Sequence, residues 1–98
     1  MKTGITILSA EDKAKEFPDT FPIPTLEARQ RISVGHYAKL MFTDGMYTER
    51  MWVQVVSQDA DTSYQGKLSN DPAFLGMVDQ EAVGFLPEHV IDIIREEF

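Results

Sequence analysis

The chain has 98 residues, of which 43% are hydrophobic and 26% are charged, so it suits one folded domain with a modest core rather than a disordered chain. Nine Lys and Arg against sixteen Asp and Glu give a net charge of -7, which disfavours general nucleic-acid binding and contact with anionic membranes. Without cysteine, no disulfide or thiolate metal site can form. We expect a cytoplasmic protein, because we find neither a signal peptide nor a run of ~20 apolar residues.

The first third of the chain predicts a helical arm followed by a proline-rich connector. Residues 5–8 are apolar enough for a short edge strand, and Ser9 then precedes two acidic residues, a pattern typical of a helix N-terminus. Pro18 ends that helix, because proline disfavours helical geometry in the residue before it. Three prolines within residues 17–24 indicate a stiff, extended connector, and Thr25 is placed to cap a second short helix with an exposed, mixed-charge surface.

Beyond the arm, the spacing of apolar residues changes from helical to alternating, which is typical of strands with one buried face. The alternating segments at 36–42 and 49–57 are separated by Asp44-Gly45, a strong reversal signal, so we expect a hairpin. Two further strands are predicted at 63–69 and 81–85.

The end of the chain contains a turn and an ambiguous segment. Pro87 suits the first position of a single tight helical turn. In residues 90–98 the apolar spacing fits a helix, but the β-branched residues favour a strand. We favour a short strand over 90–93 that closes a barrel.

Three ordered motifs resemble a bacterial family. They are Glu49-Arg50-Met51-Trp52-Val53, YQGKLSNDP over 64–72, and VGFLPEHVID over 83–92. Together with KAKEFPDTFPIP over 13–24, they are similar to the domain of unknown function 2314 (DUF2314, YegJ-like) family along most of the chain. The resemblance supports a small barrel and implies no activity, because the family has no established one.

These elements predict a single domain over residues 1–98 of the α+β class, mainly β. Residues 34–98 are expected to form a small, strongly bent antiparallel SH3-like barrel, because the order of strands and turns is similar to that of such barrels. Residues 1–33 form an N-terminal helical arm with its connector. Eight residues are predicted to fill the barrel: Leu40, Phe42, Val53, Val55, Tyr64, Leu68, Val83 and Phe85.

The opposite face of these strands is the candidate binding surface. Alternation places six side chains there: Tyr37, Lys39, Arg50, Trp52, Gln54 and Lys67. This patch suits an anionic or planar group, because Arg offers paired donors and Trp a stacking platform. A structural interpretation competes with it, in which Trp52 covers apolar residues of the arm and Arg50 pairs with Glu49 or another carboxylate.

The remaining polar residues carry weaker signals. His36 and His89 have no metal-binding spacing, so we predict no metal or other cofactor, and we expect His89 to end the tight turn and bond to the backbone. No catalytic residue is assigned, because no nucleophile motif is present. The alternative is a small enzyme that uses His89 with Asp92 or Glu88 near Asn70.

The sequence therefore favours a non-enzymatic binding module. We expect it to contact a protein partner or a small anionic ligand through the face around Arg50 and Trp52. The acidic exterior suits a basic protein partner, as in immunity-type proteins or phage-encoded inhibitors, because opposite net charge speeds encounter.

Overall fold

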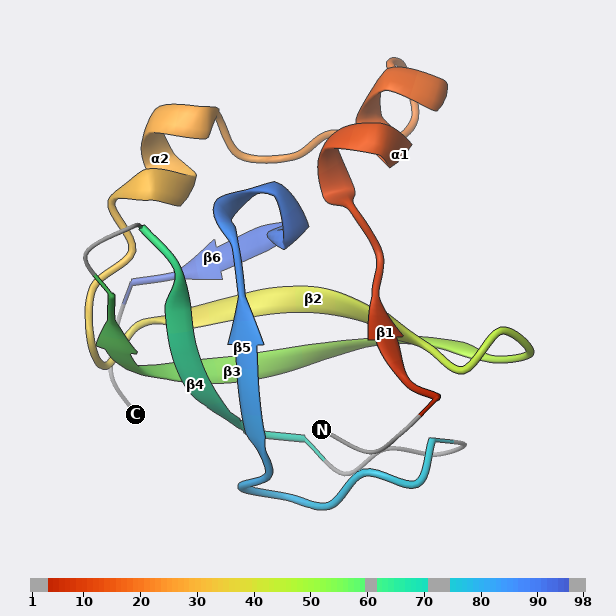
Figure 1. Cartoon of the computed structure of the whole chain (residues 1–98). Coiled ribbons are helices and arrows are strands. Elements are labelled where there is room, and N and C mark those ends of the chain that lie inside the picture. Colours follow the sequence, from red (N-terminus) through yellow and green to blue (C-terminus); the bar gives the residue numbers. More distant parts are fainter. Residues whose placement is uncertain (1–3, 60–61, 71–74, 96–98) are drawn as a thin grey trace.

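The computed structural model describes residues 4–59, 62–70 and 75–95, and its main feature is an antiparallel sheet that curls into a half-barrel (Figure 1). The strands are β1 (Thr6–Ile7), β2 (Tyr37–Thr43), β3 (Thr48–Gln58), β4 (Tyr64–Leu68), β5 (Ala82–Phe85) and β6 (Asp92–Ile94). Three short helical segments lie at one end of the half-barrel: α1 (Ala10–Glu16), α2 (Leu26–Gln30) and the 3-10 turn η1 (Pro87–His89). No helix in these ranges is long and apolar enough to cross a membrane.

Strand β2 is where the two ends of the described chain meet. The sheet order is β1-β2-β3-β4-β5, and β6 also pairs with β2. On one edge β2 pairs with β3 along its whole length. On the other edge, β1 lies opposite Phe42 and Thr43, and β6 lies opposite residues 37–39. The predicted short strand near the C-terminus is therefore present, at 92–94 rather than 90–93.

The predicted hairpin joins β2 to β3 and extends beyond the rest of the sheet (Figure 1). Its turn is closed by Asp44, whose Oδ1 accepts hydrogen bonds from the backbone N–H groups of Met46 and Tyr47, both at 2.8 Å. These two bonds hold the pKa of Asp44 below its usual value. Gly45 has a φ of 94°, a left-handed conformation that favours glycine.

Strands β3 and β4 approach each other so closely at Gly66 that a side chain would not fit there. A Cβ atom on Gly66 would clash with Cγ1 of Val53 and would lie 2.6 Å from the carbonyl oxygen of Gln54. The register shifts just beyond this point, between Val55 and Ser57, which is the signature of a bulge. The bulge bends β3 and contributes to the curl.

The core fills the concave side of the sheet. All eight residues predicted to fill it are buried, so that prediction is confirmed. Segments outside the central strands add further buried side chains, namely Ile5, Ile32, Leu75, Met77 and Val90. Each large apolar side chain buried in this way contributes on the order of 1.5–3 kcal/mol.

The predicted helix starts are also confirmed. The Ser9 hydroxyl accepts a hydrogen bond from the N–H of Asp12 at 3.2 Å, and the Thr25 hydroxyl accepts one from the N–H of Ala28 at 3.1 Å. Helix α1 ends at Glu16, two residues before the proline. These caps fix where each short helix begins.

Helix α2 departs from the exposed helix predicted for it, because Arg29 is only 5% exposed. Its Nη1 donates to Oε2 of Glu11 at 2.7 Å and to the carbonyl oxygen of Pro87 at 3.0 Å. Its Nε donates to the carbonyl oxygen of Pro24 at 2.9 Å. One guanidinium thus ties α1, the connector, α2 and η1 together at one end of the half-barrel.

Candidate functional site

The outer face is the face of the sheet opposite the core, and its residues follow from the strand register. All six candidate residues lie on it: Tyr37, Lys39, Arg50, Trp52, Gln54 and Lys67. Lys39 lies directly between Trp52 on β3 and Asp92 on β6. The alternation expected from the sequence therefore places these side chains together.

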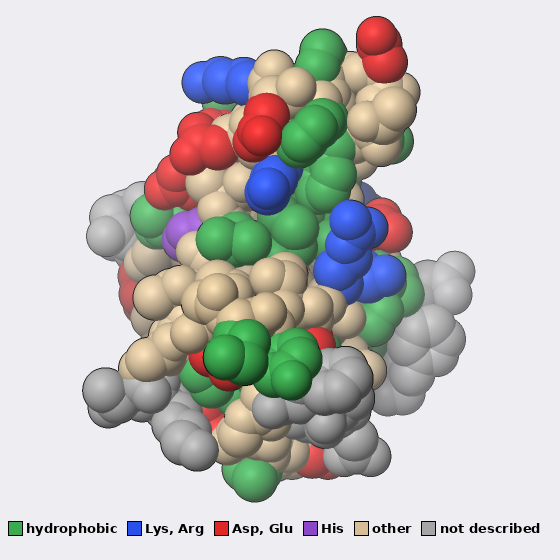
Figure 2. All heavy atoms as spheres, turned by 90° about the vertical axis from the view of Figure 1, so that its right-hand side faces the viewer, with side chains coloured by type: hydrophobic (Ala, Val, Ile, Leu, Met, Phe, Trp, Pro, Cys, Tyr) green, Lys and Arg blue, Asp and Glu red, His purple; other side chains and the backbone are tan. Residues whose placement is uncertain are grey.

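At one end of the outer face, the arm covers the sheet and leaves an apolar hollow of about 310 Å³, here called the arm hollow. Its apolar lining is Leu8, Phe17, Phe21 and Met41, and Lys13 and Arg50 also line it. Met41 is only 3% exposed although it lies on the outer face, because the arm packs over it. In Figure 2, hydrophobic side chains gather in the upper half of the face toward the viewer, with Lys and Arg beside them.

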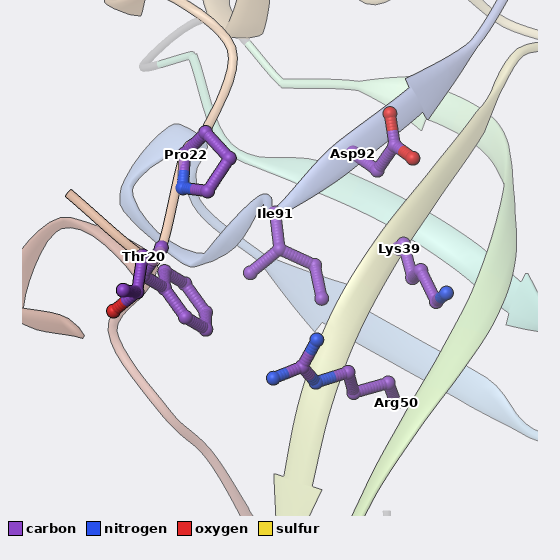
Figure 3. Close-up of a pocket in the computed structure, with 7 residues that line it drawn as sticks. Thr20, Pro22, Lys39, Arg50, Ile91 and Asp92 are labelled. Atoms are coloured by element: carbon purple, nitrogen blue, oxygen red, sulfur yellow. The ribbon is translucent and has the colours of Figure 1, made fainter. Parts of the chain in front are cut away.

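A second hollow, of about 230 Å³, lies next to the first and is called the central hollow (Figure 3). Residues 20–22 of the connector line it, together with Ile91 and Asp92 near the C-terminus. Lys39 and Arg50 enter it from the sheet. Arg50 reaches toward the connector, whereas the Lys39 ammonium points away from it (Figure 3). The Arg50 guanidinium therefore faces the connector, whereas the Lys39 ammonium lies near the Trp52 ring.

The third hollow, of about 260 Å³, is called the tryptophan hollow. It is lined by Tyr37, Trp52, Ser69 and Ile94, and three of these four side chains are large and apolar or aromatic. Trp52 is half-buried, and its backbone N–H donates to Oδ1 of Asn70 at 2.5 Å. This bond links Asn70, which follows the end of β4, to β3 at the position of Trp52.

Three cation–aromatic pairs connect the hollows. Lys13 Nζ lies 5.7 Å from the ring centre of Phe17, and Arg50 Cζ lies 5.3 Å from that of Phe21. Both pairs line the arm hollow, and the second also lines the central hollow. Lys39, from the central hollow, lies 5.5 Å from the Trp52 ring of the tryptophan hollow. We call this continuous surface the cation–aromatic track.

The structural interpretation of Arg50 needs a correction. Within the described ranges, the ion pairs join Arg29 to Glu11 and Arg31 to Glu27, and the contact of Arg50 is with the Phe21 ring. The aromatic residue of the connector thus packs on Arg50, while Trp52 lines a separate hollow.

Two candidate residues lie beside the track. Gln54 donates from Nε2 to the carbonyl oxygen of Gly35 at 3.4 Å, so it supports the loop before β2. Lys67 is exposed on β4 and is not among the residues that line the three hollows. The track therefore holds four of the six candidates.

Three of the four residues of the enzyme alternative accept hydrogen bonds from backbone N–H groups. Nδ1 of His89 accepts the N–H of Leu86 at 2.9 Å, which confirms the expected backbone bond, and burial lowers the pKa of His89. Oδ1 of Asp92 accepts the N–H of Ile93, and Asn70 holds the N–H of Trp52. Among the described residues, no group of three or more His, Asp or Glu is placed to hold a metal.

Sequence reasoning missed Lys13 and did not assign Phe17 or Phe21 to the site. These three residues recur at intervals of four, which places them on one side of a helix and of the turn that follows it. The turn after α1 is closed by a hydrogen bond, in which the N–H of Phe21 donates to the carbonyl oxygen of Phe17 at 3.0 Å. This spacing is the signal that could have identified them.

Arg50 and Trp52 belong to the first of the three motifs that resemble the domain of unknown function 2314 family. No family model matches the chain, and no curated protein or solved structure matches it. The resemblance therefore stays a prediction from those motifs.

Proposed function

We propose that this protein is a non-enzymatic binding module that contacts a protein partner through the outer face around Arg50 and Trp52. The observation that carries the proposal is the continuity of the track, in which three cation–aromatic pairs connect three hollows. A cation held over a ring has already lost part of its side-chain freedom, so binding an anionic group costs less entropy. Such preorganisation favours recognition.

A protein segment fits this surface better than a small anion, the other ligand class suggested by the sequence. A compact anion such as phosphate can pair with Arg50, but it leaves the apolar lining of the arm and tryptophan hollows uncovered. The three hollows, of about 230 to 310 Å³, instead offer separate seats for successive side chains. A protein segment can occupy all three at once.

The charge of the whole chain favours one biological context. A net charge of -7 attracts a partner of opposite net charge at long range, which supports an immunity-type protein or a phage-encoded inhibitor. This attraction concerns the whole partner. At contact distance, the track residues Lys39 and Arg50 decide which segment of the partner fits.

For the fold we propose an SH3-like barrel with an N-terminal helical arm. The support is the order of elements, in which the β2–β3 hairpin is followed by β4, β5, η1 and the short β6. The enzyme alternative has no comparable support. The hydrogen bonds of His89, Asp92 and Asn70 run to three different backbone groups rather than to one another.

Site-specific photocrosslinking in cells that make the protein tests the proposed function. The photoreactive amino acid p-benzoylphenylalanine replaces Tyr37 in the tryptophan hollow, and in a control chain it replaces the exposed Val78. We expect a discrete protein adduct from position 37 only, which weakens when Lys39→Gln and Arg50→Gln are added. Equal adducts from both positions, or none from position 37, would refute a contact through this face.

A further inference from the structure

We infer that the track binds an extended segment of the partner in which carboxylates and bulky apolar side chains follow one another at every second residue, so that both kinds point to the same side. This inference rests on the proposed function and adds the chemistry of the contact segment. It follows from the charges of the track, from its apolar seats and from the spacing of both along the sheet.

The charge of the track is opposite in sign to that of the chain. Lys13, Lys39 and Arg50 line the arm and central hollows, and Asp92 is the one carboxylate among the residues that line those two hollows. The chain as a whole has a net charge of -7. A local cationic surface on an acidic protein attracts carboxylates at short range, while the remaining surface repels long polyanions.

The track also contains exposed apolar side chains, which a purely acidic ligand would leave uncovered. Phe17 is 45% exposed at the arm hollow, where Leu8 and Phe21 also lie. Tyr37 and Trp52 form a second apolar seat at the other end. Covering such surface favours binding by roughly 25 cal/mol per Å² of apolar area removed from water. A segment that carries only carboxylates leaves both seats uncovered.

The spacing of the track matches an extended chain. Arg50 and Trp52 are two residues apart on β3, so their backbone positions are separated by about 6.6 Å along the strand. Alternate side chains of an extended peptide repeat at the same interval. A segment that follows β3 can therefore present a carboxylate to Arg50 or Lys39 and an apolar side chain to the neighbouring hollow.

Titration with short peptides tests the inference, and the chain's single tryptophan provides the signal because Trp52 lies in the track. The probe is an acetylated and amidated peptide without Trp, in which every second residue is Glu, Phe, Glu and Leu in turn and Ser stands between them. One comparison peptide has Lys in place of Glu, and another has Ser in place of Phe and Leu. Lys39→Gln with Arg50→Gln removes two cations of the track. Lys15→Gln with Arg31→Gln is the matched control, because both are exposed and neither lines the track.

We expect the Glu, Phe and Leu peptide to change the Trp52 emission and to bind more tightly than both comparison peptides. Its affinity should fall roughly tenfold or more in the track variant, since two charged contacts are lost, and should change less than about twofold in the control. Added salt should weaken binding to the native chain, because the cations are partly exposed.

Two outcomes would overturn the inference: tighter binding of the Lys peptide, or equal binding of the acidic peptide to the native chain and the track variant. Tight binding of the Ser peptide would overturn the apolar half of it. If the crosslinking at position 37 persists in any of these cases, the contact face stands and only the ligand class is wrong. If that crosslinking is also absent, the proposed function itself fails.

Discussion

Arg29 and Arg50 occupy contrasting regions of the same molecule. Arg29 is 5% exposed and donates to Glu11 and to the carbonyl oxygens of Pro24 and Pro87. Arg50 is exposed, lies over the Phe21 ring and lines two hollows. A ring occupies the flat side of a guanidinium and leaves its edge N–H groups directed elsewhere. The comparison teaches that a buried arginine paired with a carboxylate holds the fold, whereas an exposed arginine over a ring suits recognition.

The largest expected effect is that of Arg29→Met on stability. The change removes three hydrogen bonds and leaves the Glu11 carboxylate and two carbonyl oxygens without this donor. Breaking one side of a buried charge pair costs roughly 3–5 kcal/mol. Because the Glu11 side chain is 34% exposed, the free energy of unfolding should fall by about 3 kcal/mol, the lower end of that range. Urea unfolding followed by circular dichroism measures it.

Arg31→Met is the control for this prediction. Arg31 lies on the solvent side of the same region, where its ion pair with Glu27 joins side chains that are 73% and 70% exposed. Exposed pairs of this kind contribute about 0.5 kcal/mol or less, so this variant should unfold almost like the native chain. Similar losses for Arg29→Met and Arg31→Met would contradict a special role for the buried network.

A smaller loss is expected for Tyr64→Phe. The buried hydroxyl of Tyr64 donates to the carbonyl oxygen of Arg29 at 2.8 Å, so the core of the half-barrel is bonded directly to α2. Removing the hydroxyl leaves that carbonyl without its donor, which should lower the free energy of unfolding by roughly 1–2 kcal/mol. The double variant with Arg29→Met should lose less than the sum of the two single losses, because both act on the attachment of α2. Strictly additive losses would contradict this coupling.

The pH dependence of stability tests the environment of His89, the last residue of η1. Burial lowers the pKa of His89 below its usual value, although Glu88 opposes the shift. The unfolded chain therefore binds this proton more readily, so the stabilising contribution is complete above about pH 6.5 and declines as pH falls through the lowered pKa of the folded state. His89→Asn should flatten urea stability between about pH 7.5 and 5.5. The titration of Asp44 changes stability only below about pH 4, because its pKa is lowered. It therefore does not overlap with the effect of His89.

Much of the sheet could be predicted because its determinants are local. Alternation along β3 was enough to separate buried Met51, Val53 and Val55 from Trp52 and Gln54 on the outer face. The helix caps at Ser9 and Thr25 were predictable for the same reason, since each bonds to an N–H three residues away. The outer face of the candidate site therefore follows from short-range patterns.

The two arginine environments could not be predicted, because each depends on contacts distant in sequence. Arg29 meets the carbonyl of Pro87, 58 residues further along the chain, and no local pattern marks an arginine in a mixed-charge helix as buried. The partner of Arg50, Phe21, comes from the connector. Met41, which alternation alone places on an open face, is 3% exposed and shares a hollow with residues of α1 and the connector. Periodicity assigns a face, but tertiary packing decides what covers it.

Arg50→Met is expected to have the smallest effect on stability. It is also the sharpest test of the comparison between Arg29 and Arg50. Its contact with Phe21 is worth roughly 0.5–1 kcal/mol, and methionine retains much of the apolar contact with the ring. Urea unfolding should therefore differ from that of the native chain by less than about 1 kcal/mol, several-fold less than for the identical replacement of Arg29. If Arg50→Met instead destabilises the chain as much as Arg29→Met does, then Arg50 also holds the fold together. The track would then lose the cation that joins two of its three hollows, and recognition through it would have to rest on Lys13 and Lys39.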